Sequence, residues 1–472
     1  MFIGRTRELK SLKEVYEKNG FGMTVIYGRR RIGKSALIAE FLKGKKSIFY
    51  TATKVGGEKN AELFAKQALA VLDPKYAEAK FSSIETVLDI ITQKTGKEKI
   101  VIVIDELPYW AEKDEALLSI LQKYIDTQWA KKNIMLILCG SSLSFMESKI
   151  LSEKSPIFGR RDNQIKLDAF NYKEAALFVP NYSAEDKAIC YGVTGGVAKY
   201  LSLFDKKKSL DENIKNLFFN PNGYLFDETK NLLTQEFSDT TLANNVIEQI
   251  ASGENNLNNI ASKVKEREST VLYCLEKLME VDLVEKRKCA TEEKNKKKTQ
   301  YVLKDTMFKF WYKFIPAAYS LIEIGQGEVY YKTFVKPHMH SFMGSVFENM
   351  CRTYTLEKGA QGKIGSFITS VGTYWGVEQI TDESGGKVQQ SFDIDVVGIS
   401  DIEKSAVIGE CKFKNEKIDK SVYELLIRRA AAISGKYPVK KYMLFSLKGF
   451  TKWFETLNDK SVILVTLDKM YL

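Results

Sequence analysis

The first 170 residues alternate short apolar runs with amphipathic stretches. The apolar runs predict strands, and the stretches between them have the spacing of helices with one apolar face. The predicted strands are 23–27, 47–51, 100–104, 134–139 and 164–167. The run 100–104 contains five β-favouring residues in succession, which is typical of a strand buried on both faces. The pattern therefore predicts an α/β domain built on a parallel sheet over residues 1–170.

The remainder of the chain predicts four further segments. Residues 171–238 have helical periodicity and predict a helical lid. Residues 239–305 predict three helices and then two short strands, the order of a winged helix-turn-helix. Aromatic residues recur at helical spacing over 306–335 and predict a core-facing linker helix. Residues 336–472 predict helix, strands, helix and strands, which is a second α/β domain.

The predicted winged helix carries a lysine-rich turn, residues 294–298, between its two strands. Lysines of this kind contact nucleic-acid phosphates without distinguishing sequence. The third predicted helix, 269–281, can enter a DNA major groove. A packing module with a solvated hairpin fits the same pattern, so DNA is one of two interpretations of this segment.

Composition narrows the class of protein. A length of 472 residues suggests three or four domains. The formal net charge of +11 is compatible with a nucleic-acid partner and equally with simple solubility. No apolar run approaches the roughly 20 residues of a membrane span, and the first residues do not resemble a signal peptide, so we expect a cytoplasmic protein with no membrane partner. The six cysteines and two histidines lack zinc-site spacing.

Residues 28–35 fit the phosphate-binding pattern G-x-x-x-x-G-K-[ST] at every fixed position. They follow a predicted strand and precede a predicted helix, which is the context of a true P-loop. Gly28 and Gly33 permit backbone angles and close approach that a Cβ would block, so that loop amides face phosphate oxygens. Lys34 is expected to reach the β- and γ-phosphates, and Ser35 to bind Mg²⁺. An incidental strand-to-helix turn is the weaker interpretation.

Polar residues follow the next two strands. Asp105 and Glu106 come directly after the buried run, at the edge where open parallel sheets bind ligands. We expect Asp105 to hold Mg²⁺ and Glu106 to orient the attacking water. After strand 134–139, either Ser141 or Ser142 is placed to sense the γ-phosphate; a helix N-cap serine is the equal alternative.

An arginine pair follows the core at Arg160 and Arg161. An arginine in this region can stabilise transition-state charge, either in its own active site or across a subunit interface. Arg160 is therefore a candidate catalytic residue. A surface turn with solvated arginines is the alternative.

The C-terminal region carries ionisable groups on segments that predict buried strands. Asp395 adjoins an apolar pair, and Glu410 and Lys412 are two residues apart, so both project to one face. Such groups are rare in strands unless they are paired or functional. Asp395, Glu410 and Glu348 are candidate Mg²⁺ ligands, and Lys412 is a candidate for stabilising charge on a phosphodiester. A structural salt-bridge cluster and an inactive nuclease fold are the alternatives.

The N-terminal part resembles the archaeal-type P-loop ATPases of the AAA+ and STAND lineage. The resemblance rests on 2–5 with Glu8, on 28–35, on 105–106, on 139–142, on 159–160 and on 194–200, where family members usually carry proline at the position of Ala198. It implies that ATP is the nucleotide. The implied binding residues are Phe2, Gly4, Arg5, Gly28, Arg29, Arg30, Arg31, Ile32, Gly33, Lys34, Ser35, Ala36 and Ser141.

The tail resembles the restriction-endonuclease-like domain of unknown function that is commonly fused to these ATPases. This second resemblance rests on 347–348, 393–395 and 410–412. Together the two imply an α/β multidomain protein in which ATP and Mg²⁺ operate a switch over a DNA nuclease. The alternative is an ATP-dependent signalling or DNA-binding protein with an inactive nuclease-like domain. DNA is the expected partner, and a homo-oligomer is compatible with the sequence.

Overall fold

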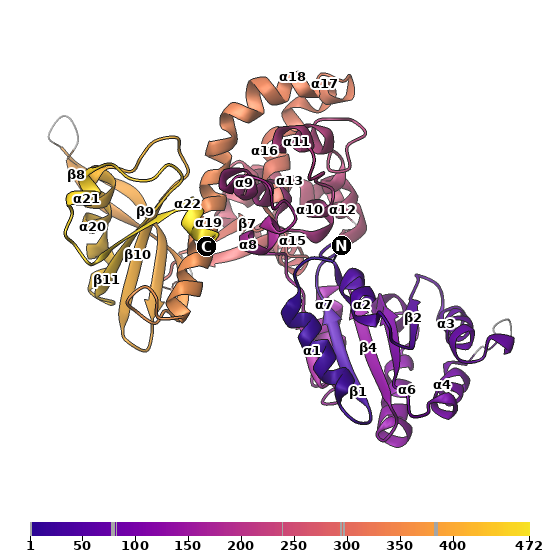
Figure 1. Cartoon of the computed structure of the whole chain (residues 1–472). Coiled ribbons are helices and arrows are strands. Elements are labelled where there is room, and N and C mark those ends of the chain that lie inside the picture. The colour runs from indigo at the N-terminus through magenta and orange to yellow at the C-terminus, as the bar shows by residue number, and fades with distance from the viewer. Residues whose placement is uncertain are drawn as a thin grey trace. The chain divides into compact units, whose positions relative to one another are not determined.

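The computed structural model describes residues 2–76, 81, 83–237, 239–292, 295, 298–381 and 386–472 (Figure 1). The chain forms two compact units. The first contains the residues up to Phe170 together with Val197–Lys199. The second contains Asn171–Gly196 and Tyr200–Leu472.

A five-stranded parallel sheet organises the first unit. Its strands are β1 Gly22–Tyr27, β2 Ser47–Thr51, β3 Ile100–Asp105, β4 Ile134–Gly140 and β5 Asn163–Lys166. Their order across the sheet is β2-β3-β4-β1-β5, and each neighbouring pair is parallel. The five strands predicted from the apolar runs are all present, with ends shifted by at most a residue or so.

Helices cover both faces of this sheet. They are α1 Thr6–Glu17, α2 Lys34–Leu42, α3 Gly57–Leu72, η1 Pro74–Tyr76, α4 Ile84–Lys94, α5 Leu107–Ala111, α6 Leu117–Tyr124, η2 Ile125–Trp129, α7 Leu143–Phe145 and η3 Met146–Ile150. Alternate residues of β3 enter different cores: Ile102 joins the cluster with α3, α4 and α6, whereas Val101 and Val103 join the cluster with α1 and α2. Burial on both faces explains why β3 is apolar without interruption.

Helices begin the second unit. They are α8 Tyr172–Ala176, α9 Ala184–Thr194, α11 Leu210–Phe218, α12 Glu228–Glu236, α13 Thr240–Ala251, α14 Leu257–Val264 and α15 Glu268–Glu280. Helix α10 Ala198–Ser202 begins in the first unit and ends in the second. The antiparallel strands β6 Val284–Lys288 and β7 Thr299–Leu303 follow. The three helices and two strands expected within 239–305 are therefore present. Of the lysine-rich turn, Lys294, Lys296 and Lys297 lie outside the described residues, and Lys298 pairs with Glu292 at 2.6 Å.

The aromatic segment faces the core, as its spacing predicts. Phe308, Phe310 and Trp311 are buried, and the ring of Phe310 lies 4.9 Å from that of Phe218. The prediction of one linker helix over 306–335 is wrong, because the segment is broken into short helices at a proline and a glycine that do not continue a helix. These are α16 Thr306–Phe314, η4 Pro316–Ala318, α17 Tyr319–Glu323, α18 Gly327–Tyr330 and η5 Tyr331–Val335, followed by η6 Lys336–His338.

The long helix α19 Met339–Ala360 leads into a second sheet. Its strands are β8 Ser370–Thr381, β9 Lys387–Ser400, β10 Ser405–Lys412, β11 Val439–Ser446 and β12 Val462–Thr466, in the order β12-β11-β10-β9-β8. The first three strands pair antiparallel, and β10, β11 and β12 pair parallel (Figure 1). Helix α20 Lys420–Ser434 connects β10 to β11, and the short helices α21 Trp453–Thr456 and α22 Leu467–Met470 flank β12. None of the helices in the described ranges has the length and apolar character that crossing a membrane requires.

Two glycines of α19 give a matched test of the packing around it. A Cβ on Gly344 would meet no atom within 4 Å, whereas a Cβ on Gly359 would lie 2.5 Å from two side-chain carbons of Ile368. We expect Gly344→Ala to raise the free energy of unfolding by about 0.5–1 kcal/mol. We expect Gly359→Ala to lower it by about 1–3 kcal/mol through overpacking. Thermal unfolding of the full chain measures both, and shifts of the same sign would contradict this packing.

Candidate functional site

The glycine loop leaves the carboxyl end of β1 and enters α2. A Cβ on Gly28, where φ is +150°, would lie 2.3 Å from the carbonyl oxygen of Leu167, so only glycine fits this approach. Gly33 has φ +96° and immediately precedes α2. The strand, loop and helix predicted for residues 28–35 are therefore formed, and loop amides with the start of a helix are suited to phosphate oxygens.

Lys34 points back into this loop. Its Nζ donates to the carbonyl oxygens of Gly28 at 2.8 Å and Arg29 at 3.0 Å. Burial lowers the pKa of this ammonium, although Asp105 and Glu106 favour its charge. A buried ammonium held by carbonyl oxygens is poorly compensated, and phosphate oxygens are much stronger partners for it.

Ser35 and Asp105 meet although they are 70 residues apart in the chain. The Ser35 hydroxyl donates to Asp105 Oδ2 at 2.9 Å, and the other carboxylate oxygen accepts from the amide of Glu106 at 3.0 Å. A hydroxyl and a carboxylate in contact are the oxygen donors that Mg²⁺ prefers. The predicted pair is thus brought together with a donor set that fits this ion.

Glu106 is held in an unusual conformation beside Ser141. Its φ of +50° is rare outside glycine. Its Oε2 accepts from the Ser141 hydroxyl at 2.8 Å and from the Ser141 amide at 3.2 Å. Ser142 instead caps α7 by accepting from the amide of Phe145. The structure therefore separates the two serines: Ser141 contacts the predicted catalytic carboxylate, and Ser142 is the N-cap.

The N-terminal residues 2–5 lie against the same loop. Arg5 donates from Nη2 to the carbonyl oxygens of Asp168 at 2.6 Å and Ile32 at 3.3 Å. Its guanidinium lies 4.0 Å from the centroid of the Phe170 ring. Gly4 is required there, because a Cβ would lie 2.9 Å from Phe170. Phe2, Gly4 and Arg5 thus belong to the neighbourhood of the phosphate loop.

Sequence reasoning missed three partners of this loop. Arg30 donates to the hydroxyl of Tyr109 at 2.6 Å, and Arg5 uses the backbone of Asp168. The amide of Lys199 donates to the carbonyl oxygen of Arg31 at 3.0 Å. Tyr109 lies only three residues beyond Glu106, and this short spacing could have indicated that Tyr109 lies near the loop. Backbone contacts of Asp168 and Lys199 leave no signal in side-chain identity.

Arg160 lies away from the phosphate loop. It precedes β5, which runs parallel to β1 with Asn163 opposite Thr24. Arg160 is therefore near the amino-terminal edge of the sheet, whereas the phosphate loop follows the carboxyl end of β1. Its Nε and Nη2 donate to the two carboxylate oxygens of Asp126, both at 2.7 Å. A catalytic role for Arg160 stays a prediction, and the structure places this residue at the opposite edge of the sheet from the phosphate loop of the same chain.

A second group of charged residues lies in the C-terminal sheet. The antiparallel register of β9 and β10 pairs Val396 with Gly409, which makes Asp395 and Glu410 the next positions along. Asp395 Oδ2 accepts from the amide of Cys411 at 2.9 Å. Glu410 is 7% exposed, and its Oε1 accepts from Lys412 Nζ at 2.6 Å. Three of the four predicted residues therefore form one cluster.

Burial and neighbouring charges shift the pKa values of two groups in this cluster. Burial, followed by the charges of Glu410 and Glu348, raises the pKa of Asp395 well above its ordinary value. Burial opposes the charge of Lys412, yet the carboxylate of Glu410 raises its pKa. Two carboxylates this close favour a cation between them.

The predicted three-carboxylate shell is not assembled. Over the described ranges, no three His, Cys, Asp or Glu side chains lie together as a metal site requires. Glu348 faces Arg352 instead, with 3.6 Å between the carboxylate oxygen and Nη1, and the same Nη1 donates to the carbonyl oxygen of Asp395 at 2.9 Å. The oxygen donors that fit a divalent cation are therefore those of Asp395 and Glu410.

Comparison with known proteins finds two family models that match different parts of the chain. Residues 2–204 match the family model described as an ATPase domain predominantly from Archaea. Residues 311–423 match the model described as archaeal and bacterial proteins of unknown function. A 440-residue region is 28% identical to the uncharacterized protein MJECL04 of Methanocaldococcus jannaschii and covers 92% of each chain.

Two further similarities are to an ATP-binding protein and to a solved ATPase structure. Over 46 residues, 10% of this chain and 78% of the relative, the chain is 44% identical to the uncharacterized ATP-binding protein MJ0423 of the same organism. The Walker-type ATPase PABY2304 of Pyrococcus abyssi shares the fold at a TM-score of 0.50 and 18% identity, covering 66% of this chain and 96% of that one. Residues 2–204 are thus similar to an archaeal ATPase domain, and the enzymatic activity of the chain is ATP hydrolysis.

Substitutions at the loop separate nucleotide binding from hydrolysis. We expect Lys34→Ala to abolish ATP binding, because the charge that neutralises the outer phosphates is lost. We expect Glu106→Gln to retain binding and to slow hydrolysis by about 10²–10⁴-fold, the usual contribution of a positioned base. Nucleotide titration and phosphate release measure the two steps. Ser142→Ala is the control and should hydrolyse ATP normally, and unchanged ATP affinity in Lys34→Ala would refute the site.

The pair Arg160–Asp126 gives a test with a defined pH dependence. The hydrogen bond from Arg160 lowers the pKa of Asp126. The stabilisation is therefore present above the ordinary aspartate pKa and is lost as pH falls through the lowered value. We expect Arg160→Ala and Asp126→Asn each to cost at most about 1 kcal/mol at neutral pH, as surface pairs do. Unfolding at neutral and acid pH measures the difference, which should vanish in acid.

Both variants of this pair should hydrolyse ATP at the wild-type rate. An arginine that completes a neighbouring subunit's site contributes about 10³–10⁵ in rate. A loss of that size in Arg160→Ala but not in Asp126→Asn would assign Arg160 to the active site of another copy.

Proposed function

We propose that ATP binding and hydrolysis in the first unit control a Mg²⁺-dependent DNA nuclease in the C-terminal sheet domain. The observation that carries the proposal is the cluster of Asp395, Glu410 and Lys412. Burial and the nearby charge of Glu410 make ionisation of Asp395 costly, so this arrangement is expensive for stability. Such groups concentrate at functional sites.

The surrounding topology supports a restriction-endonuclease-like interpretation. Helix α19 carries Glu348 and is followed by the antiparallel strands β8, β9 and β10. Asp395 lies on β9, and Glu410 and Lys412 lie on β10. Helix α20 then leads to the parallel strand β11. This is the order in which the sequence resemblance expects the acidic residues and the lysine.

Mg²⁺ held by Asp395 and Glu410 would lower the pKa of bound water and neutralise charge on the scissile phosphate. The chain's own residues prepare the site. The amide of Cys411 orients the carboxylate of Asp395, and Arg352 fixes the backbone of the same residue. Lys412 would exchange its bond to Glu410 for a phosphodiester oxygen and stabilise the charge that develops there.

Nucleotide binding would control the nuclease through the segment Val197–Lys199. This segment lies in the first unit, where the amide of Lys199 donates to the carbonyl oxygen of Arg31. A Cβ on Gly33 would lie 3.4 Å from the Cβ of Ala198. Peptide bonds join it on both sides to helical segments of the second unit. Gly195 and Gly196, at φ +61° and +68°, precede it. A loop that changes partners when it binds phosphate would therefore move a segment continuous with the nuclease unit.

DNA is the proposed partner, contacted through the helices and strands of 240–303 as a winged helix. The net charge of +11 supports a polyanionic partner. We further propose a cytoplasmic protein in which Mg²⁺ accompanies ATP at Ser35 and Asp105. A homo-oligomer would be needed for Arg160 to reach a nucleotide, since its own is across the sheet.

One observation favours a second candidate function. Lys412 and Glu410 bond one another at 2.6 Å, which neutralises both groups as a structural ion pair would. In that case the ATPase would signal through a nuclease-like domain that binds DNA without cutting it.

Cleavage assays decide between the two candidates. We expect the full chain to cut plasmid DNA with Mg²⁺ or Mn²⁺ and ATP, and Asp395→Asn to lose at least about 10²-fold in rate because one cation ligand is gone. ATP hydrolysis by Asp395→Asn should be unchanged. Asp393→Asn is the matched control, since this aspartate lies two residues earlier on β9 and is exposed, whereas Asp395 is partly buried. Equal cleavage by wild type and Asp395→Asn would refute this cluster as the nuclease site, and no cleavage by either would leave the binding function.

A further inference from the structure

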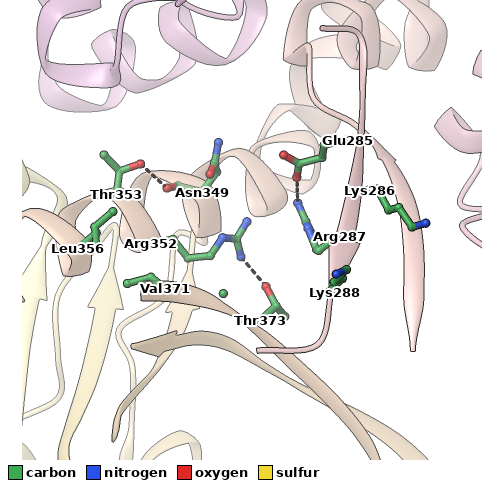
Figure 2. Close-up of a pocket in the computed structure, with 11 residues that line it drawn as sticks. Glu285, Lys286, Arg287, Lys288, Asn349, Arg352, Thr353, Leu356, Val371 and Thr373 are labelled. Carbon is green, nitrogen blue, oxygen red and sulfur yellow. Dashed lines mark hydrogen bonds and ion pairs between the residues drawn. The ribbon is translucent and has the colours of Figure 1, made fainter. Parts of the chain in front are cut away.

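A cavity of about 370 Å³ lies within the second unit, between β6, α19 and β8 (Figure 2). Strand β6 supplies the residues 285–288. Helix α19 supplies Asn349, Arg352, Thr353 and Leu356, and the β8 segment 371–373 closes the third side. The cavity therefore joins the two-stranded hairpin to the C-terminal sheet domain.

The charges that line this cavity are unbalanced. Four side chains are basic and one is acidic: Lys286, Arg287, Lys288, Arg352 and Glu285. Glu285 pairs with Arg287 at 2.9 Å. Figure 2 shows the guanidinium of Arg352 pointing toward Arg287 across the cavity. Arg352 is 9% exposed, so its charge is poorly solvated.

A further cation, Lys309, lies close enough to these two arginines to feel their charge. Lys309, on α16, has its pKa lowered by burial and by the charges of Arg287 and Arg352, with Glu348 acting in the opposite direction. Like charges gathered in a partly buried space repel one another, and an anion relieves that repulsion. The cavity has the composition of a site for a phosphate group.

The cavity is also next to the acidic cluster. Arg352 Nη1 donates to Thr373 Oγ1 at 3.0 Å, inside the cavity wall, and to the carbonyl oxygen of Asp395 at 2.9 Å. The guanidinium of Arg352 thus contacts both the cavity wall and the backbone of the acidic cluster. A strand of nucleic acid whose phosphate sat in the cavity would have a neighbouring phosphate directed toward Asp395 and Glu410.

We propose that this cavity binds a backbone phosphate of the DNA strand presented to the acidic cluster, with Arg287 and Lys288 from the hairpin and Arg352 from α19 as its ligands. The inference rests on the proposed function and deepens it, because it names where the substrate is held. A polynucleotide suits the cavity better than a free phosphate. Lys288 is exposed at its rim, so its positive charge extends beyond the buried part of the cavity.

The test neutralises the hairpin side of the cavity and leaves the buried Arg352 in place. The variant is Arg287→Gln with Lys288→Gln, in the full chain. The matched control is Lys206→Gln with Lys207→Gln, which removes two charges from an exposed turn outside the cavity. Binding of a fluorescein-labelled DNA duplex is followed by anisotropy in EDTA over a range of NaCl concentrations. Unfolding temperature and ATP hydrolysis verify that each variant is folded.

We expect the cavity variant to bind the duplex at least about tenfold more weakly at moderate salt, and its plot of log affinity against log salt to be less steep by about 1, because one phosphate contact is lost. The control should lose less affinity and keep more of the slope. Equal losses in the two variants would overturn the inference.

Two other outcomes are informative in the same way. If wild type binds the duplex and the cavity variant binds it equally well, the inference fails while the proposed function stands. If the cavity variant loses only inorganic phosphate binding, measured by calorimetry, the cavity holds a free phosphate and the inference also fails. Absence of DNA binding by wild type would instead refute the proposed function itself.

Discussion

The buried ammonium of Lys34 is the interaction on which the nucleotide unit depends. The glycine loop encloses it and gives it only backbone carbonyl partners at Gly28 and Arg29. An ammonium in that position is costly without an anion, so the loop has an electrostatic requirement for phosphate. Around it the sheet brings Ser35 to Asp105 and Glu106 to Ser141, each across a long stretch of sequence. Phosphate affinity and hydrolysis thus follow from one arrangement of strand ends.

The second unit contains two neighbouring clusters of like charge, one negative and one positive. Asp395 and Glu410 gather negative charge on adjacent strands, while Arg287 and Arg352 gather positive charge in the cavity beside them. Arg352 links the two, because it bonds the backbone of Asp395. A cation between carboxylates and a phosphate between guanidiniums relieve both repulsions together. The proposed ligand, a metal-bound nucleic-acid strand, would supply both charges at once.

Several residues separate what patterns predict from what they miss. The apolar runs located all five strands of the first sheet, and the three central strands are buried on both faces, which leaves few alternatives for such runs. Ser141 and Ser142 could not be distinguished by sequence, since a sensor and a helix cap use the same hydroxyl. Arg160 was assigned to the active site because its position along the chain does not reveal the edge of the sheet on which it falls. Glu348 was grouped with Asp395 and Glu410, yet helix geometry turns it toward Arg352.

By itself the sequence determined the phosphate loop, the strands that flank it, and the residues capable of acid, base or metal chemistry. These are local properties: glycine torsions, hydrophobic periodicity and the ionisable groups available. Tertiary structure alone decided which of those groups meet, because strand order and helix orientation join positions tens to hundreds of residues apart. It made Ser141 the partner of Glu106, placed Arg160 at the opposite edge of the sheet from the phosphate loop, and formed a basic cavity from a hairpin, a helix and a strand that no motif connects.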